Sequence, residues 1–308
     1  MPRAASILRP APAGALPHFL NLPAVSSENP KSIVAPLAGS AGAAEGLPRP
    51  GAKGARAFDA AIFDLDGVIT QTAAVHARAW KRMFDEYLQR RESVHGEAFL
   101  EFSPGDYRAH VDGRPRYGGV ATFLASRGIE LPPGSPGDPA GRETICGLGN
   151  RKNELFNEII GTDGVKVYAS TLGLIHELRA LGIRMGLATS SRNSDLVLSG
   201  TQAEGLFATI VDGVVSERLG LRGKPHPDIF VTACANLGVP CARAIVVEDA
   251  VAGVQAGATG GFGLVVGVAR EDNARELRDG GADLVVCDLA EVSVEEINRL
   301  IRHKGAAA

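Results

Sequence analysis

From residue 58 onward, short apolar runs alternate with segments of helical pattern, and this alternation limits the possible folds more than any other feature. Each run ends in polar residues, as a strand does when it is buried on both faces of a sheet. The runs cover residues 58–64, 183–188, 208–211, 244–247 and 264–268, with a weaker one at 283–286. Strands separated by helices predict an α/β fold with a parallel, doubly wound sheet. Such a sheet binds ligands at the carboxyl ends of its strands.

The interval between the first two runs breaks this rhythm. Its helical patterns cover residues 73–88, 118–127 and 151–160. Residues 131–141 are rich in proline and glycine and predict an irregular loop. A helical module inserted here would lie above the carboxyl end of the first strand, in the position of a lid. We therefore predict a catalytic core of residues 57–72 and 165–303, with a helical cap of residues 73–164.

Residues 1–56 differ from the rest in composition. Proline, alanine, glycine and serine dominate them, and no helical or strand period persists, which predicts a disordered extension. A transit peptide is the alternative, because the first 27 residues carry Arg3 and Arg9 but no acidic residue. Prolines such as Pro10 and Pro17 argue against it, since they interrupt any amphipathic helix.

The composition excludes several classes of function. A formal net charge of -3 provides no basic field of the kind that holds nucleic acid. No apolar run approaches the roughly 20 residues that span a bilayer, so we expect no membrane association. The four cysteines lack C-x-x-C spacing, which favours the reducing cytoplasm over structural disulfides or zinc. We expect a monomer, because core and cap would cover each other and no coiled-coil heptads occur.

The most informative motif, Asp64-Leu65-Asp66-Gly67-Val68, directly follows the first predicted strand. Two carboxylates at this spacing project to the same side and repel each other unless a cation lies between them, and hard oxygen ligands suit Mg²⁺. One carboxylate is then available to attack phosphorus while the other transfers protons. Gly67 permits the tight turn that follows. The alternative is that two aspartates merely occupy a turn.

Three further polar clusters follow later strands. Residues 189–191 (TSS) offer hydroxyls and backbone N–H groups suited to a phosphate, although an ordinary N-cap has the same pattern. Lys224 lies beside prolines in G-K-P-H-P, where a solvated surface charge is the alternative. Glu248 and Asp249 end a buried strand, and an acidic pair there is costly without a cation. The alternative for Asp249 is a helix cap.

The four clusters together resemble a known family. In their order and spacing, F-D-L-D-G-V, A-T-S-S, G-K-P-H-P-D and V-E-D-A resemble the four motifs of the haloacid dehalogenase-like superfamily. The resemblance covers residues 58–301, which is nearly all of the chain beyond its N-terminal part. It implies a Rossmann-like sheet core with a helical C1 cap inserted after the first strand.

The resemblance also implies a role for each motif. Asp64 would be phosphorylated, and Asp66 would act as general acid and base with its backbone carbonyl on Mg²⁺. Glu248 and Asp249 would complete the metal site, directly or through water. The phosphate-binding residues would be Thr189, Ser190 and Lys224. Positioning and charge neutralisation supply most of the catalysis in phosphoryl transfer.

Within this superfamily the cap is most similar to that of the β-phosphoglucomutases. The stretch D-G-V-I-T-Q-T-A-A-V-H-A-R-A-W, the segment G-R-P-R and the tripeptide R-K-N resemble their motifs. The resemblance places Arg116 on the phosphate that is not transferred and Lys152 over the substrate. The implied substrate-binding residues are Thr72, His76, Trp80, Gly113, Arg116, Lys152, Ser191, Arg192 and Asn193.

Ordinary structural roles remain open for these cap residues. Arg116 could be a surface arginine, and Lys152 could pair with Glu154 or Glu158 on a helix surface. His76 and Trp80 are four residues apart and could simply form the inner face of a helix.

The sequence thus predicts a magnesium-dependent mutase that acts on a small sugar phosphate. It would interconvert β-D-glucose 1-phosphate and glucose 6-phosphate through an aspartyl phosphate and a bisphosphate intermediate. A sugar-phosphate or small phosphate-ester phosphatase is the main alternative, and a non-catalytic regulatory relative is a third. Two features depart from the mutase pattern: Gln71 stands where aspartate is usual, and the loop at 131–141 lengthens the cap.

Overall fold

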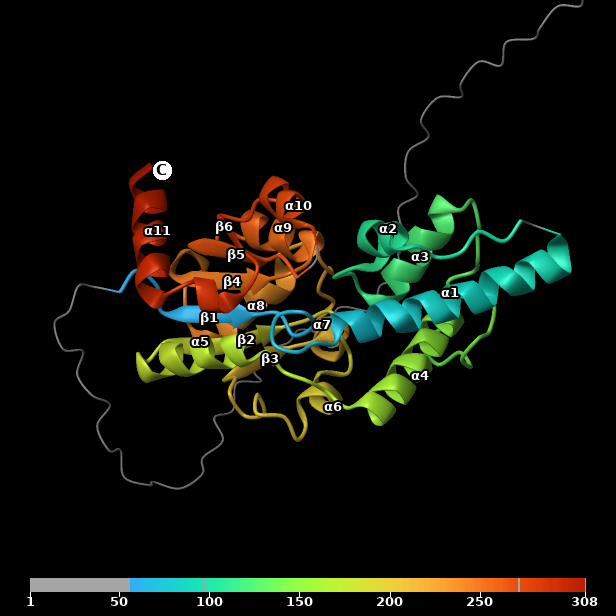
Figure 1. Ribbon diagram of the computed structural model, residues 1–308, viewed down its shortest axis with the longest axis horizontal. Coiled ribbons are helices and arrows are strands. Elements are labelled where there is room, and N and C mark those ends of the chain that lie inside the picture. The colour runs from blue at the N-terminus through green and yellow to red at the C-terminus, as the bar shows by residue number, and fades with distance from the viewer. Residues whose placement is uncertain (1–55, 97, 271, 308) are drawn as a thin grey trace, which may run out of the picture. The chain divides into compact units, whose positions relative to one another are not determined.

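The computed structural model describes residues 56–96, 98–270 and 272–307, so the predicted N-terminal extension lies outside the described residues except for Arg56. Six strands of the described residues form one sheet in the order β3-β2-β1-β4-β5-β6, and all neighbouring strands are parallel (Figure 1). The strands are β1 (Ala60–Phe63), β2 (Arg184–Ala188), β3 (Thr209–Val211), β4 (Ala244–Glu248), β5 (Leu264–Val268) and β6 (Leu284–Val286). The predicted α/β fold is confirmed.

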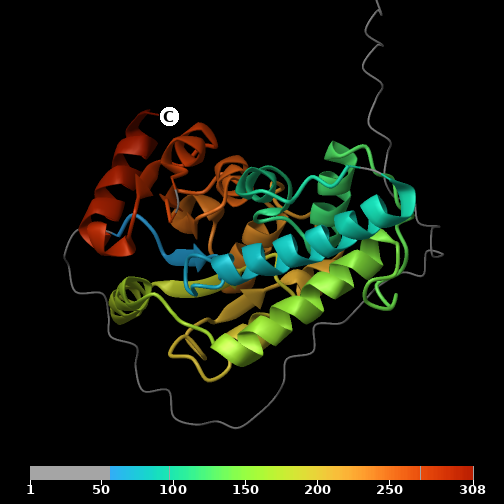
Figure 2. The ribbon, with the colours of Figure 1, turned by 45° about the vertical axis from the view of Figure 1, so that its right-hand side comes forward.

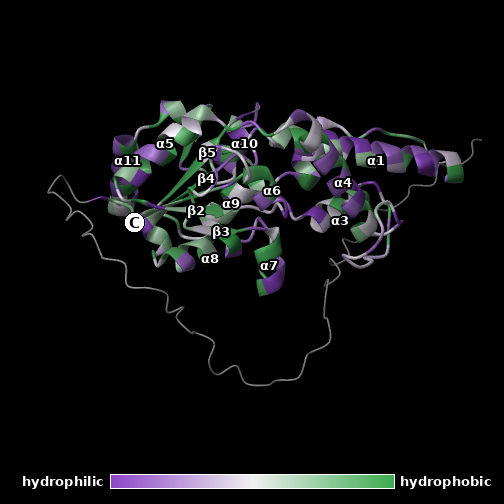
Figure 3. Ribbon diagram, turned by 90° about the horizontal axis from the view of Figure 1, so that it is seen from below, coloured by the Kyte–Doolittle hydropathy of each residue, from purple (hydrophilic) through white to green (hydrophobic). Residues whose placement is uncertain are grey.

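Helices cover both faces of this sheet. Side chains alternate across a strand, so Ala61 and Phe63 pack in one apolar cluster while Ala60 and Ile62 pack in another. The first cluster includes residues of α5 (Ala169–Ala180) and α11 (Val294–Ala307). The second includes residues of α8 (Asp228–Leu237), α9 (Val251–Thr259) and α10 (Ala274–Asp279). The strands are therefore apolar on both sides, as Figure 3 shows by their hydropathy.

The register brings the polar strand ends together. Phe63, the last residue of β1, lies opposite Leu187 of β2 and Val247 of β4. Asp64 and Glu248 therefore lie at the same edge of the sheet. The strand order changes direction between β1 and β4, and ligands of doubly wound sheets bind at such a point.

Among the described residues, four α-helices and one π-helix lie between β1 and α5, the helix that precedes β2. They are α1 (Ala73–His95), α2 (Pro104–Asp106), the π-helix η1 (Tyr107–Val111), α3 (Arg116–Ser126) and α4 (Ile145–Asp163). The two longest, α1 and α4, run side by side (Figure 2). Their interior is aromatic, with the rings of Phe84 and Phe123 4.1 Å apart and those of Phe84 and Phe102 5.0 Å apart. The remaining short helices are α6 (Ser194–Leu198), α7 (Gly213–Leu219), η2 (Cys241–Arg243) and η3 (Leu289–Glu291).

The cap helices begin or end elsewhere than the sequence predicts. The last of them starts at Ile145 rather than at residue 151, because the Thr144 side chain accepts a hydrogen bond from Gly147 N and caps it. Glycines at 147 and 149 obscure this start. Gly149 serves close packing there, since a Cβ would lie 2.7 Å from the Tyr117 ring.

The two connections between core and cap run side by side. Thr70 and Val167 form an antiparallel bridge, and Gln71 N donates to Lys166 O at 2.8 Å. Gln71, which stands where the mutases usually have aspartate, is exposed. The glutamine side chain therefore does not pack against the protein interior. The division at residues 72/73 and 164/165 stays a prediction. Among the described residues, no helix has the length and apolar character required to cross a bilayer.

Candidate active site

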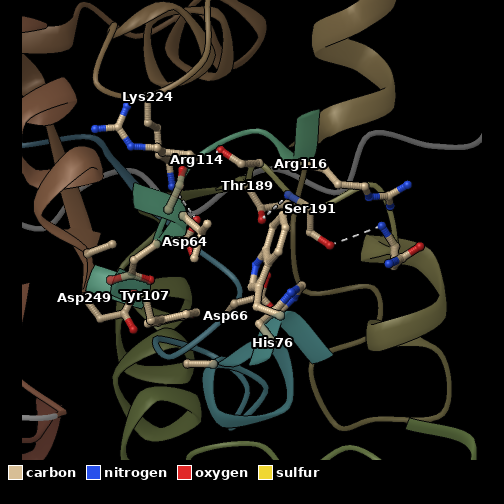
Figure 4. A pocket seen from close by; sticks show the side chains of 18 of the residues that line it. Asp64, Asp66, His76, Tyr107, Arg114, Arg116, Thr189, Ser191, Lys224 and Asp249 are labelled. Carbon is tan, nitrogen blue, oxygen red and sulfur yellow. Dashed lines mark hydrogen bonds and ion pairs between the residues drawn. The ribbon is translucent and has the colours of Figure 1, made fainter. Parts of the chain in front are cut away.

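A cavity lies where the carboxyl ends of the central strands face the cap (Figure 4). With the exception of Thr72, the predicted site residues all line it, although their roles stay predictions. They are Asp64, Asp66, His76, Trp80, Gly113, Arg116, Lys152, Thr189, Ser190, Ser191, Arg192, Asn193, Lys224, Glu248 and Asp249. Thr72 lies beside the cavity and hydrogen bonds to Asp66.

The turn after β1 aims both aspartates at the cavity. Gly67 N donates to Thr70 O at 2.8 Å, which closes the turn. Gly67 has a φ of +85°, a left-handed conformation that costs a non-glycine residue free energy. A Cβ at this position would lie 1.7 Å from Asp249 Oδ2. Glycine is therefore required both by the backbone and by the close approach of a carboxylate from the end of β4.

Lys224 is the buried cation at the base of the cavity. Its Nζ donates to Asp64 Oδ1 at 2.6 Å and to Glu248, and its side chain is only 1% exposed. Burial opposes the charged ammonium, but the two carboxylates outweigh it and raise the pKa of Lys224. The solvated-surface alternative for this residue is therefore wrong.

The negative charge at this end exceeds what Lys224 compensates. Burial raises the pKa of Asp64 to about 8, with further contributions from Glu248 and Asp66. Burial, and then Glu248 and other carboxylates, raise the pKa of Asp249 well above its ordinary range. Carboxylates in this situation attract either protons or a cation.

The donor set fits Mg²⁺. In the described part of the chain, no three His, Cys, Asp or Glu side chains alone make a metal site. Mg²⁺ is usually held by one or two carboxylates together with other oxygens and substrate phosphate. Asp64 and Asp249 could supply the carboxylates and Asp66 its carbonyl. Glu248 is less suited to direct contact, because its oxygens accept from Lys224 and from Ala250 N at 2.8 Å.

The second aspartate, Asp66, is held by residues at the start of α1. Thr72 donates to Asp66, and Thr72 and Thr70 share a hydrogen bond of 2.6 Å. His76 Nε2 lies 3.2 Å from Asp66 Oδ1, at an angle that leaves this nitrogen without a regular hydrogen bond among the described residues. Burial raises the pKa of Asp66, but its contacts with His76 and Thr72 outweigh that and lower it. Asp66 is therefore ionised in this arrangement.

Lys152 extends this chain of contacts into the cap. Its Nζ contacts His76 Nδ1 and lies 5.1 Å from the Trp80 ring and 4.9 Å from the Phe156 ring. Burial, followed by the charge of Arg116, lowers the pKa of Lys152 to about 7. The surface-pair alternative for Lys152 is wrong, because its side chain is buried among the cavity residues.

Arg116 and Arg192 are two of the three arginines that line the cavity. Arg116 Nη2 donates to Asn153 Oδ1 at 2.6 Å, and Asn193 Nδ2 donates to the same oxygen at 2.8 Å. Burial lowers the pKa of Arg116 from its high ordinary value. Arg192 forms an ion pair with Glu217 of α7.

The segment 189–191, predicted to bind phosphate, contacts the cap through a direct hydrogen bond. Ser190 Oγ donates to Gly113 O at 2.9 Å, and Ser191 N donates to Thr189 Oγ1 at 3.0 Å. Thr189 is buried at the base of the cavity. Hydroxyl and backbone donors thus meet at one point, as a bound phosphate requires.

Four residues that the sequence analysis missed complete the surroundings. Tyr107, Asp112 and Arg114 line the cavity, and Asn153 orients Arg116. Tyr107 and Asp112 flank a π-helical turn, which has no sequence signature. For Asn153 a signal existed, since the R-K-N tripeptide had already been singled out.

Comparisons with known proteins agree with this geometry. A family described as haloacid dehalogenase-like hydrolase matches residues 58–261. A β-phosphoglucomutase of Mycobacterium tuberculosis is 45% identical over 237 residues, which cover 76% of this chain and 90% of that protein. A β-phosphoglucomutase of Bacillus subtilis is 31% identical over 237 residues, which cover 77% of this chain and 92% of that protein.

A solved structure shares the fold. The crystal structure of a β-phosphoglucomutase from Clostridium difficile superposes with a TM-score of 0.64 at 24% identity, covering 81% of this chain and 99% of that one. Both the family match and the extent of the sequence identity are sufficient to classify the chain. It belongs to the haloacid dehalogenase-like hydrolase family and, within that family, to the enzymes of the β-phosphoglucomutase group.

Proposed function

We propose that this chain interconverts β-D-glucose 1-phosphate and glucose 6-phosphate through an aspartyl phosphate and a bisphosphate intermediate. One observation carries the proposal: the cavity that holds Lys224 beside Asp64 is also lined by Arg116 and Lys152 from the cap helices. A sugar bisphosphate needs positive charge at both ends. The names of the mycobacterial and Bacillus relatives support the same activity.

In this proposal Asp64 is the nucleophile. Its carboxylate attacks phosphorus, the bond from phosphorus to the sugar oxygen breaks, and an aspartyl phosphate results. Lys224 and Thr189 hold the transferring phosphoryl oxygens. Mg²⁺, when bound, supplies positive charge that favours the ionised nucleophile and offsets the charge of the phosphoryl group. Asp64, Asp249 and the carbonyl of Asp66 would hold it.

Asp66 transfers the proton. It takes up the proton of the sugar hydroxyl that receives the phosphoryl group from Asp64, and it gives this proton to the sugar oxygen that departs when Asp64 is next phosphorylated. Thr72 and His76 hold it at the mouth of the cavity, where the sugar must lie. Because both contacts come from the start of α1, movement of the cap changes the position of this carboxylate.

The cap determines whether the phosphoryl group reaches a sugar or water. A mutase must retain the bisphosphate while it reorients, and must exclude water from the aspartyl phosphate. Arg116 and Lys152 supply donors for the phosphate that is not transferred, and Trp80 and Phe156 close the space behind Lys152. A phosphatase needs only the lower site, so the upper cations favour the mutase over that alternative.

The test follows two products together. The purified chain is incubated with β-glucose 1-phosphate, Mg²⁺ and a trace of glucose 1,6-bisphosphate, and glucose 6-phosphate and free phosphate are measured. We expect glucose 6-phosphate without matching phosphate release. Phosphate release alone would replace the mutase with a phosphatase, and inactivity toward every phosphate ester tried would favour the non-catalytic relative.

Variants separate the two ends of the cavity. Asp64→Asn should abolish turnover, because it removes the nucleophile. Arg116→Ala should reduce mutase activity far more than phosphate release, and equal loss of both would contradict the assignment. Arg142→Ala is the matched control, because this cap arginine is 61% exposed and pairs only with Asp138 among the described residues.

We further propose that the chain acts in the cytoplasm, as a monomer, on a small sugar phosphate. Its four cysteines carry free thiols, which agrees with a reducing compartment. The mass in solution, measured by light scattering, tests the monomer directly, and a dimer at micromolar concentration would overturn it.

A further inference from the structure

The segment before Gly113 has an unusual backbone. Helix α2 begins with a capping box in which Ser103 and Asp106 exchange hydrogen bonds. The chain then forms a π-helical turn, and Asp112 N donates to Tyr107 O at 3.0 Å. Isolated π turns are rare and occur frequently at functional sites. Because this hydrogen bond joins residues five apart, the side chains at 107 and 112 lie on roughly the same side.

That side faces the catalytic centre. Tyr107 and Asp112 both line the cavity, and Figure 4 shows Tyr107 beside Asp249. The Tyr107 hydroxyl hydrogen bonds to the Asp112 carboxylate, and the negative charges of Asp249 and Asp66 lie close enough to act on it. The pair is held near the core by Gly113, where a Cβ would lie 2.9 Å from that of Ala250.

The chemistry of the pair selects its ligand. The Asp112 carboxylate has no donor for a phosphate oxygen and repels it, so this pair does not hold either end of a bisphosphate. A carboxylate accepts several hydrogen bonds at once, and a phenol oxygen that donates to it can still accept. The two side chains are therefore suited to a neutral ligand group that donates hydrogen bonds. The sugar hydroxyls are such groups in a sugar phosphate.

We propose that Tyr107 and Asp112 form a hydroxyl-binding subsite that reads the sugar ring and sets the choice of sugar. The inference rests on the proposed function for its substrate. The two phosphates are held at Lys224 and at Arg116, and the pair lies beside the metal side of the cavity. It thus fixes the rotation of the ring about the line between its two phosphates.

The test compares variants across substrates that lack single hydroxyls. The reactions of wild type, Tyr107→Phe and Asp112→Asn are measured with β-glucose 1-phosphate and with its 2-deoxy, 3-deoxy and 4-deoxy analogues. For Tyr107→Phe we expect kcat/KM on the full substrate to fall by about tenfold, as for a lost neutral hydrogen bond of ~1 kcal/mol. For Asp112→Asn we expect a fall of about ten- to a hundredfold, as for a lost charged hydrogen bond of ~2 kcal/mol. With the analogue that lacks the recognised hydroxyl, the fall should shrink to less than about twofold.

Two results would overturn the inference. One is a loss that is the same for all four substrates, which would make the pair structural. The other is no loss with any of them. Tyr87→Phe is the control, because this buried cap tyrosine bonds Arg91 and lies outside the cavity. Thermal unfolding of each variant shows whether the fold is kept.

The same experiment distinguishes failure of the inference from failure of the proposed function. The wild-type products with β-glucose 1-phosphate decide the function. If wild type releases only phosphate, the comparison is repeated on that hydrolysis, and the pattern across the analogues still decides the role of the pair.

Discussion

Replacing Lys224 by methionine measures how much the buried charges of the active site contribute to the free energy of unfolding. Lys224 Nζ is 2.6 Å from Asp64 Oδ1 and also contacts Glu248, with the lysine side chain 1% exposed. Where Asp64 is ionised, Lys224 and Asp64 attract by about 6 kcal/mol at that distance and an effective dielectric constant of about 20. Much of this only offsets the desolvation of the ions. Removing one partner of a buried pair costs about 3–5 kcal/mol, and we expect that loss for Lys224→Met.

The loss should grow with pH. Without the lysine, the buried carboxylates can avoid their charge only by binding protons, so the folded variant holds more protons than its unfolded chain. Stability falls with rising pH wherever the folded state binds more protons. The variant should therefore lose more at pH 9 than at pH 6.

Urea unfolding in the presence of a chelator checks both statements. The midpoint should fall with little change in the slope against urea concentration. The control is Lys81→Met, because Lys81 also contacts two carboxylates, Asp85 at 2.8 Å and Glu101 at 2.9 Å, but is 47% exposed. A surface pair contributes about 0–1 kcal/mol. Equal losses for the two variants would refute the reasoning, because burial is the main difference between the sites.

Three further predictions concern Asp64 and the turn at Gly67 that follows it. The pKa of Asp64 is about 8 in the folded chain and 3.8 in the unfolded chain, so the folded chain holds one more proton between these pH values. In the presence of a chelator, the free energy of unfolding should therefore fall between pH 4 and pH 8. Mg²⁺ should make this decline smaller. Gly67→Ala should destabilise the chain by at least about 1–3 kcal/mol in urea unfolding, because the residue has a φ of +85° and its Cβ would meet Asp249. Arg270 Nε donates to Gly67 O at 3.0 Å, and its guanidinium lies 3.6 Å from a tyrosine ring of the linker returning from the cap. Arg270→Lys should therefore lower kcat by about tenfold with less than a twofold change in KM, since lysine cannot keep both contacts.

Each of these has a control. Asp64→Asn should remove the pH dependence, and an unchanged slope would contradict its origin in that carboxyl. Gly118→Ala, in α3, meets no atom within 4 Å and should be neutral or slightly stabilising. Arg275→Lys changes an arginine that is 90% exposed and should leave kcat as it is. A similar fall in kcat for both arginine variants would remove the positioning role of Arg270.

The sheet was predictable because its signals are local. An apolar run such as residues 60–63 followed by two aspartates and a glycine identifies both a buried strand and the turn at its end. The helix starts in the cap were less predictable, because Gly147 and Gly149 are unfavourable in a helix and are explained only by packing against other segments.

The site divides in the same way. The core residues have a motif at each strand end, whereas the cap residues were predicted from resemblance and not from their own chemistry. The contact of Arg270 with the Gly67 carbonyl depends on atoms distant in sequence, and the π turn at Tyr107 is local but has no sequence signature. No pattern of residue types predicts such contacts, so these residues became visible only in the structure.

The cations Arg116, Arg192 and Lys152 of the cavity differ in how far their charge is compensated, and this favours Arg116 among them as the ligand of the second phosphate. Arg192 pairs with Glu217, so most of its charge is already compensated. Lys152 is easily deprotonated, because its pKa is lowered to about 7. Arg116 instead bonds the neutral amide of Asn153, and its charge remains available to an anion.

Removing Arg116 should therefore weaken the mutase reaction by at least about a hundredfold, as expected for a charge-assisted bond to phosphate of about 3 kcal/mol. Removing Arg192 should cost about tenfold or less, because the phosphate must displace Glu217 to reach it. Steady-state kinetics of Arg116→Ala and Arg192→Ala on β-glucose 1-phosphate decide between them. If Arg192→Ala proved the more damaging, the ion pair would have to open in the substrate complex, and Glu217→Gln would then increase affinity for the substrate.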